Sequence, residues 1–329
     1  MRLHRRKNAG ASLAVATIAL LLSVPQSVLA GDKTLLVLGD SYAYGFTTDQ
    51  DAIAIGPTFG DQGYVKPFAD YLGSVNGGVR PDLVNLAIPG ESSTSFKTGV
   101  SAANYPDTYP YTSSLQEAPS RFPLLNLNYA PSAAPNYVTT PQKDVALGAI
   151  ATAHASNKKV ENIVLQIGGN DILGLLNQSA FLTLPPLQQQ NLFTAQFAAL
   201  QSNYVNILGT VRAAAPEARI FTVGYANSFR QTPNLGELTE TLTLNANAII
   251  SGVSQNFGAT YVDIYTPFKN HELELTYEAQ GNPHPNATGY SVIAGQLQIA
   301  ASAPEPATIA LCILALPVAA FAVRRRITR

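Results

Sequence analysis

The chain has 329 residues, of which 46% are hydrophobic and 12% are charged, so it can bury a sizeable core. Residues 31–300 hold 12 of the 20 Lys and Arg residues and 20 of the 21 Asp and Glu residues, a formal net charge of −8. An acidic domain without a basic stripe argues against nucleic acid as a partner. The single cysteine, Cys312, lies in an apolar C-terminal stretch, which excludes a disulfide and a thiolate metal site in the folded domain.

The first 30 residues have the pattern of a secretory signal peptide. Basic residues up to Lys7 precede a mostly apolar stretch from Ala11 to Val24, and Val28 and Ala30 occupy the two positions that a signal peptidase inspects. We therefore expect cleavage by signal peptidase after Ala30 and export of the mature chain.

Between residues 31 and 300, short aliphatic segments alternate with helical patterns. This alternation predicts one α/β domain in which a mostly parallel sheet is covered by helices on both faces. The expected strands are 34–38, 82–87, 162–167, 218–224 and 260–265. The expected helices are around 64–72, 144–155, 187–214, 238–256 and 287–301.

The stretch 98–142 differs from the rest of the domain. It is rich in Pro, Tyr, Ser and Asn and has no steady periodicity. A connection of this length is usually functional or disordered. We interpret it as a flap that faces a substrate near Gly90, and a solvated spacer without function is the alternative.

The first expected strand ends at Gly-Asp-Ser-Tyr (39–42), which puts a serine hydroxyl at the carboxyl end of a buried strand. In open α/β sheets, ligands bind at that edge. Three distant segments supply what this hydroxyl would need for catalysis. They are Asn-Leu-Ala-Ile-Pro-Gly-Glu at 85–91, Gly-Gly-Asn-Asp at 168–171 and His-Pro-Asn-Ala-Thr-Gly-Tyr at 284–290.

A serine hydroxyl is a poor nucleophile until a base takes its proton. Outside the signal peptide, the chain has three histidines. His154 lies in an alanine-rich helical pattern and is most simply a surface or packing residue, and His271 lies in a polar connection, for which a surface position is the simpler interpretation. His284 opens a loop after the last strand, from which it can reach the edge that holds Ser41. It is the candidate base.

Acyl transfer also needs hydrogen-bond donors where the carbonyl oxygen gains negative charge. Gly90 follows the second strand, and without a side chain its backbone N–H can come close to a substrate. Asn170 follows the third strand and can aim its carboxamide at the same point, with the N–H of Ser41 as a third donor. Either Gly90 or Asn170 alone could be a turn residue. Their joint position after neighbouring strands favours an oxyanion hole.

The four blocks, in this order from residue 39 to residue 290, resemble the SGNH/GDSL hydrolase superfamily. The resemblance covers nearly the whole expected mature domain. It implies a three-layer α/β/α, flavodoxin-like fold with a doubly wound, mostly parallel five-stranded sheet. The Gly-x-Ser-x-Gly elbow of the α/β-hydrolase fold is absent, which separates the two classes of serine esterase.

The resemblance also implies the roles of the site residues. Ser41 would be the nucleophile, and His284 the general base and then the acid for the leaving group. The backbone of Ser41, with Gly90 and Asn170, would form the oxyanion hole. Asp40 would have a supporting role in shaping the turn.

One position departs from the family pattern. Many members have an aspartate three residues before the catalytic histidine, where it orients the imidazole. In this chain that position is Gly281. Asn282 or a backbone carbonyl could orient His284, an acid such as Glu278 or Asp263 could fold in, or catalysis could be weak or lost. We prefer the first interpretation, a working Ser-His dyad.

Other chemistries have little support. Neither Gly-x-Gly-x-x-Gly nor a Walker pattern occurs, and no His-Glu-x-x-His run exists. Too few histidines remain for a convincing metal site. We expect neither a cofactor nor a metal.

The C-terminal end also has the pattern of a targeting segment. Pro-Glu-Pro (304–306) is followed by a mostly apolar segment (307–323) and three arginines (324–326). Together these features resemble the PEP-CTERM sorting signal of bacterial envelope proteins. The resemblance implies transient anchoring of the tail, residues 301–329, in the inner membrane and its removal by an exosortase. A plain membrane anchor is the alternative.

The prediction is an exported serine esterase that acts as a monomer in the cell envelope or extracellular matrix. It would hydrolyse carboxylic esters through an acyl-serine intermediate, with acylated envelope or exopolysaccharide glycans as the preferred substrates. Lipid or lysophospholipid esters and thioesters are the alternatives within the same chemistry. A non-catalytic envelope protein that binds glycan in the cleft is the competing hypothesis from another class, supported by the missing aspartate.

Overall fold

The structure is a computed structural model that describes residues 32–47, 60–99, 141–176, 181–233 and 235–303. The expected signal peptide lies outside these residues, as does nearly all of the expected flap and of the expected sorting tail. Within the described ranges, no helix combines the length and the apolar composition needed to cross a bilayer.

In the described part of the chain, five parallel strands form one sheet in the order β2-β1-β3-β4-β5. They are β1 (Lys33–Gly39), β2 (Asp82–Asn85), β3 (Lys159–Gln166), β4 (Arg219–Val223) and β5 (Thr260–Val262). Because all the strands run the same way, their carboxyl ends meet at one edge of the sheet. The doubly wound, five-stranded α/β fold expected from the sequence is confirmed.

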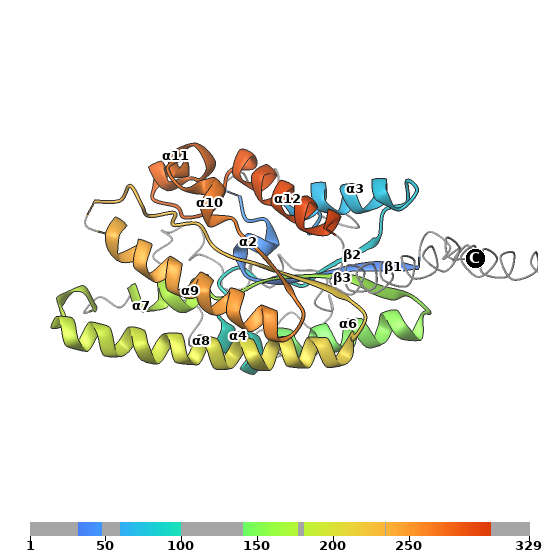
Figure 1. Ribbon diagram of the computed structural model, residues 1–329, viewed down its shortest axis with the longest axis horizontal. Helices are drawn as coiled ribbons and strands as arrows, with labels where there is room; N and C mark the ends of the chain where they lie inside the picture. Colours follow the sequence, from blue (N-terminus) through green and yellow to red (C-terminus); the bar gives the residue numbers. More distant parts are fainter. Residues whose placement is uncertain (1–31, 48–59, 100–140, 177–180, 234, 304–329) are drawn as a thin grey trace, which may run out of the picture.

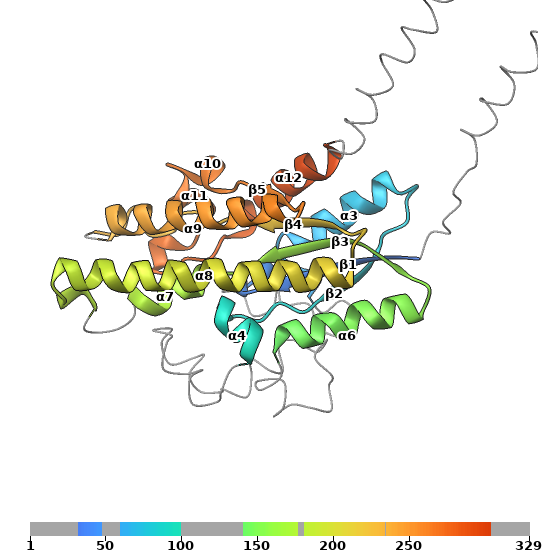
Figure 2. The ribbon, with the colours of Figure 1, turned by 60° about the horizontal axis from the view of Figure 1, so that its bottom comes forward.

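Helices cover both faces of this sheet (Figures 1 and 2). One face packs against α3 (Val65–Val75) and α12 (Ala287–Ser302), and the other against α6 (Gln142–Ala155) and α8 (Pro186–Ala214). Helix α9 (Gly236–Asn256) packs beside α8 and against β5. The shorter helices are α2 (Ser41–Tyr44), α4 (Ser93–Thr98), α7 (Gly169–Leu176), α10 (Tyr265–Phe268) and α11 (Glu272–Leu275).

The aliphatic residues of the central strands form the core. Residues 35–38 of β1 and 163–165 of β3 are at most 1% exposed. Burial of each Leu, Ile or Val side chain contributes about 1.5–3 kcal/mol. Since both faces of these strands are covered, they read as unbroken apolar runs, and the sequence pattern locates them well.

Two strands, β2 and β5, end two or three residues earlier than the sequence suggests. β5 ends at Val262, so Asp263 lies after the strand, where its Oδ1 accepts the N–H of Tyr265 at 2.8 Å at the start of α10. β2 ends at Asn85, whose Oδ1 accepts the N–H of Ala87 at 3.0 Å. In both places a short polar side chain bonds a nearby backbone donor and turns the chain out of the sheet.

Candidate active site

The turn after β1 holds Ser41 at the carboxyl edge of the sheet. Asp40 caps the N-terminus of α2, since its Oδ1 accepts the N–H of Tyr42 at 3.0 Å. The hydroxyl of Tyr225, which follows β4, donates to the other carboxylate oxygen at 2.5 Å. Burial raises the pKa of Asp40 to about 7, although both hydrogen bonds lower it. Asp40 therefore ties the serine turn to the segment that follows β4.

A glycine is required just before this turn. Gly39 has a φ of +137°, and a Cβ at this position would lie 1.9 Å from the carbonyl oxygen of Gln166 on β3. The same oxygen accepts the N–H of Asp40 at 3.0 Å. The close approach of β1 and β3 thus sets the direction in which the chain leaves the sheet.

We expect Gly39→Ala to lower the free energy of unfolding by about 3 kcal/mol or more, because it adds both backbone strain and a backbone clash. Urea unfolding monitored by circular dichroism measures the change. Gly148→Ala is the control, since a Cβ at Gly148 in α6 meets nothing within 4 Å. That variant is expected to be as stable as the wild type or slightly more stable. Equal unfolding midpoints for Gly39→Ala and the wild type would contradict this explanation of the glycine.

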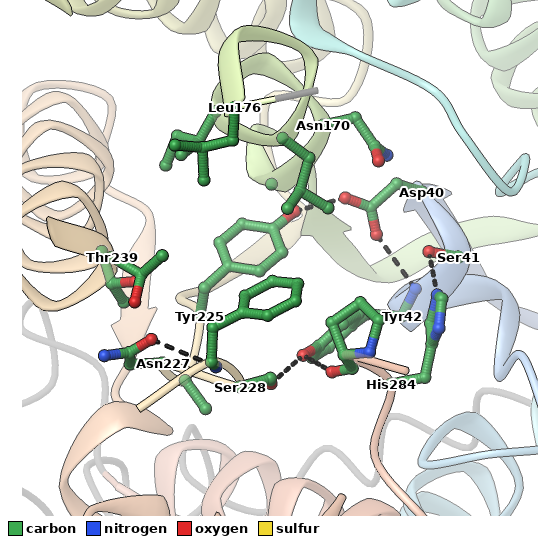
Figure 3. A pocket seen from close by; sticks show the side chains of 17 residues that line it. Asp40, Ser41, Tyr42, Asn170, Leu176, Tyr225, Asn227, Ser228, Thr239 and His284 are labelled. Carbon is green, nitrogen blue, oxygen red and sulfur yellow. Dashed lines mark hydrogen bonds between the residues drawn. The ribbon is translucent and has the colours of Figure 1, made fainter. Parts of the chain in front are cut away.

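His284 meets Ser41 across 243 residues of sequence. Its Nε2 lies 2.7 Å from the Ser41 Oγ, and its Nδ1 lies 2.6 Å from the Oδ1 of Asn282 (Figure 3 shows the first contact). The backbone N–H of His284 also donates to the Asn282 Oδ1, at 3.0 Å, which identifies that atom as the amide oxygen. An amide oxygen can only accept, so Nδ1 carries the hydrogen and Nε2 directs its lone pair at the serine hydroxyl.

Aromatic side chains enclose the histidine. The rings of Phe46 and His284 have their centroids 4.4 Å apart. Tyr42 donates its hydroxyl to the carbonyl of Pro283 at 2.6 Å and lies 2.8 Å from the Ser228 Oγ. Burial lowers the pKa of His284 to about 3, so the imidazole is neutral at neutral pH. A neutral imidazole is the state that can accept a proton.

The two acids considered as orienting groups for His284 bond elsewhere. Glu278 accepts the N–H of Gln231 at 2.7 Å, and Asp263 caps α10. The interpretation in which Glu278 or Asp263 orients the imidazole is therefore wrong. Asn282 makes that contact, two residues before the histidine.

The other two histidines are exposed, as the sequence suggests. His154 lies in α6, and the Nδ1 of His271 lies 3.3 Å from a carboxylate oxygen of Glu274. Among the residues that the structure describes, no three His, Cys, Asp or Glu side chains gather as they would around a metal ion.

The two other residues expected to donate to an oxyanion lie close together. Gly90 has a φ of +88° in the turn after β2, and the carbonyl of the next residue, Glu91, accepts a hydrogen bond from the Asn170 Nδ2 at 2.8 Å. Asn170 lies in the first turn of α7 and lines a pocket together with Ser41. Gly90 does not line this pocket.

The pocket has a volume of about 610 Å³, counting space open to solvent, and runs between α7 and α9. In Figure 3, Ser41 and His284 lie at one end and Leu176 and Thr239 at the other. Most of the surface that lines it is apolar, and Ile172, Leu173, Leu176, Tyr225, Ala226 and Phe229 contribute aliphatic and aromatic side chains. An apolar pocket beside a nucleophile suits the hydrocarbon part of a substrate.

Several side chains of the site carry no motif in the sequence. Tyr225 and Ser228 lie in the segment after β4 and Phe46 lies just after α2, and no sequence pattern connects these residues with His284. Asp171, next to Asn170, accepts the backbone N–H of Ser93 at 2.7 Å and its hydroxyl at 2.5 Å, which joins α7 to α4. The only available signal for Asp171 is its place in the Gly-Gly-Asn-Asp block.

One solved structure with a TM-score above 0.5 supports the fold. The chain is similar to a lipase from a goat rumen metagenome, with a TM-score of 0.51 and 15% identity over 81% of this chain and 96% of that one. It is also similar to an acetylxylan esterase from Geobacillus stearothermophilus, with a TM-score of 0.46 and 14% identity over 84% and 96% of the two chains. For a phospholipase A1 from Streptomyces albidoflavus, the TM-score is 0.46 and the identity 16% over 84% and 100%.

No curated protein sequence matches the chain. A family model does match, over residues 37–292, which is most of the chain and contains all four motifs. Its members are described as GDSL-like lipases and acylhydrolases. The chain therefore belongs to the GDSL-like lipase/acylhydrolase family and is a hydrolase that acts on ester bonds.

Proposed function

We propose that the protein is an exported serine esterase that hydrolyses carboxylic esters through an acyl-Ser41 intermediate. One observation carries the proposal: Nε2 of His284 lies 2.7 Å from the Ser41 Oγ, while its Nδ1 lies 2.6 Å from the Asn282 Oδ1. These distances are those of a nucleophile bonded to its base and of a base held by a third group.

The reaction has two steps. In the first, the Ser41 Oγ attacks the ester carbonyl carbon and its proton moves to Nε2 of His284. That proton then passes to the alcohol oxygen as the ester C–O bond breaks, which leaves the acyl group on Ser41. In the second, a water molecule gives a proton to Nε2 and attacks the acyl carbon, and the same proton returns to Ser41 as the carboxylic acid leaves.

Three donors are proposed for the negative oxygen of the tetrahedral intermediates. The N–H of Ser41 is the first of α2, and helix geometry provides it with no intrahelical acceptor. The N–H of Gly90 and the carboxamide of Asn170 are the other two, and the bond from Asn170 to Glu91 keeps them neighbours. Removal of one such donor typically lowers kcat about 10²–10³-fold.

Hydrolysis of p-nitrophenyl acetate and labelling by a fluorophosphonate probe test the proposal together. The purified protein is expected to turn over the ester and to become covalently labelled. A protein that does neither would instead fit the hypothesis of a glycan-binding protein that has kept the fold without the chemistry.

Two substrate classes remain, each with its own support. The resemblance of the tail to a sorting signal favours acylated glycans of the envelope or matrix. The pocket beside Ser41 favours an aliphatic acyl chain longer than acetyl, because its lining is mainly apolar and it extends away from the serine between α7 and α9. We propose the second, a lipid-like carboxylic ester, as the class that the site geometry favours.

With p-nitrophenyl esters from acetyl to octanoyl, kcat/KM is expected to rise at least about tenfold with chain length, because each buried methylene contributes about 0.8 kcal/mol. Thr239→Phe, at the far end of the pocket, is expected to remove most of that gain and to spare the acetyl ester. Thr241→Phe on the exposed side of α9 is the control. Acetyl esters that react as fast as octanoyl esters would reject the aliphatic substrate and favour acetylated glycans.

The export proposal rests on the sequence at the two ends of the chain. A protein expressed with its own termini in a bacterium with an exosortase is expected to lose residues 1–30 and then the C-terminal tail. Mass spectrometry of the purified protein measures both ends, and an intact N-terminus in the cytoplasmic fraction would contradict export.

A further inference from the structure

We propose that Gln142 is a positioning residue of the oxyanion hole, and this inference rests on the serine esterase function proposed above. Gln142 is the first residue of α6, at the end of the stretch 98–142, and is 1% exposed. Its side chain reaches the end of β1, 103 residues earlier in the chain. It does not line the pocket, so it acts on the reaction only through other residues.

The Gln142 carboxamide bonds both backbone groups of Gly39. Its Oε1 accepts the Gly39 N–H at 2.7 Å, and its Nε2 donates to the Gly39 carbonyl at 2.9 Å. β2 has already ended at Asn85, although the N–H of Ile88 still donates to the Gly39 carbonyl at 3.0 Å. A carboxamide has the same donor and acceptor as a peptide group. Gln142 therefore takes the place of a strand residue beside the last position of β1.

The same carboxamide also bonds the segment that carries Gly90 and contacts Asn170. Its Nε2 lies 3.2 Å from the Oε2 of Glu91, a carboxylate that is 1% exposed and also accepts the hydroxyl of Ser95. The backbone carbonyl of Glu91 accepts the Asn170 carboxamide at 2.8 Å. Gly90 is the residue before Glu91. One side chain thus connects the serine turn with the segment that carries Gly90 and accepts the hydrogen bond from Asn170.

This connection matters because donors to an oxyanion act only when they converge on one point. Gly39 lies two residues before Ser41. Glu91 directly follows Gly90, and its backbone carbonyl accepts the hydrogen bond from Asn170. If Gln142 loses its hydrogen bonds, the two turns can shift relative to each other. A misplacement of about 1 Å can lower a reaction rate about 10²-fold.

The test is Gln142→Met in the purified full-length protein, since methionine keeps the length of the side chain and removes its hydrogen bonds. We expect kcat for p-nitrophenyl esters to fall about 10–100-fold while KM changes less than about twofold. The affinity for octylboronic acid, which forms a tetrahedral adduct with a reactive serine, is expected to fall by the same factor as kcat. A residue that only stabilises the fold would leave both quantities unchanged in the folded protein.

Gln189→Met is the matched control. The Gln189 Nε2 donates to the carbonyls of Phe181 at 3.2 Å and Leu184 at 3.1 Å near the start of α8, and this glutamine does not line the pocket. Its kcat and boronic acid affinity are expected to equal those of the wild type.

Gln142→Glu is the second variant, and it decides the question if Gln142→Met does not fold. It keeps the shape and the acceptor for the Gly39 N–H but puts an oxygen in place of the donor, opposite the Gly39 carbonyl and the buried Glu91 carboxylate, so a loss of kcat at least as large as that of Gln142→Met is expected. If the folded Gln142 variants match Gln189→Met in kcat and in boronic acid affinity, the positioning role is rejected and the esterase proposal stands. A wild type without Ser41-dependent hydrolysis would reject the proposed function and this inference with it.

Discussion

Ser41→Ala is expected to lower kcat for p-nitrophenyl esters at least about 10⁴-fold and to abolish labelling by a fluorophosphonate probe. The reason is that both the acyl-enzyme and the phosphonylated enzyme need the Oγ atom that His284 contacts at 2.7 Å. The rate that remains would come from the oxyanion donors and from substrate binding. Stopped assays with high enzyme concentration measure this residual rate, and gel fluorescence measures the labelling.

Ser254→Ala is the control for this change. Ser254 is also buried, but its Oγ lies 2.6 Å from the hydroxyl of Thr222 in the packing between α9 and β4, away from the pocket. This variant is expected to hydrolyse esters and to take the label as the wild type does. If Ser41→Ala keeps the label and the turnover, the nucleophile lies elsewhere in the chain.

Asn282→Asp is expected to raise kcat about 10–100-fold. The amide oxygen of Asn282 orients His284, but it carries no formal charge to stabilise the imidazolium that forms when Ser41 gives up its proton. Two unit charges about 4 Å apart interact by about 4 kcal/mol at an effective dielectric constant of about 20. Desolvation of the new carboxylate offsets part of this gain, because Asn282 is 9% exposed.

The pH profile of Asn282→Asp gives an independent readout. Burial holds the pKa of His284 at about 3, and a carboxylate beside the ring raises it. Because the base works only when neutral, kcat/KM of the variant is expected to begin its acid decline at a higher pH than that of the wild type. Asn282→Leu, which removes the acceptor, is expected to lower kcat, and Asn245→Asp on the exposed side of α9 controls for the added charge. An acid limb at the same pH in both proteins would show that Asn282 does not act on the histidine.

The strands and the contact between Ser41 and His284 could be predicted because the motifs that indicate them are local. Buried parallel strands are unbroken aliphatic runs, as residues 35–38 and 163–165 show. Each motif follows a strand or precedes a helix, and parallel strands bring their carboxyl ends to one edge. That edge is where Ser41, Asn170 and His284 lie.

The group that orients His284 could not be chosen from the sequence, because the choice depends on how one loop folds. The N–H of Tyr277 donates to the carbonyl of His284 at 2.9 Å, and the N–H of Asn282 donates to the carbonyl of Tyr277 at 3.1 Å. These bonds turn the loop so that Asn282 reaches the imidazole, while Glu278 is held by the N–H of Gln231. No periodicity encodes such a loop.

The hydrogen bonds of Gln142 could not be predicted from the sequence for a different reason. The sequence assigns this glutamine to the end of a long irregular stretch, whereas α6 begins with it. Its contacts with Gly39 and Glu91 join residues 103 and 51 positions apart. Unlike the contact between Ser41 and His284, these contacts have no motif in the sequence that marks them.

Peptide mapping by mass spectrometry after fluorophosphonate treatment tests the Ser41–His284 pair most directly. In the wild-type protein the added mass is expected on the Ser41 side chain, and in His284→Ala the labelling is expected to be strongly slowed. A label on another residue, or ester hydrolysis without any label on Ser41, would contradict the catalytic pair.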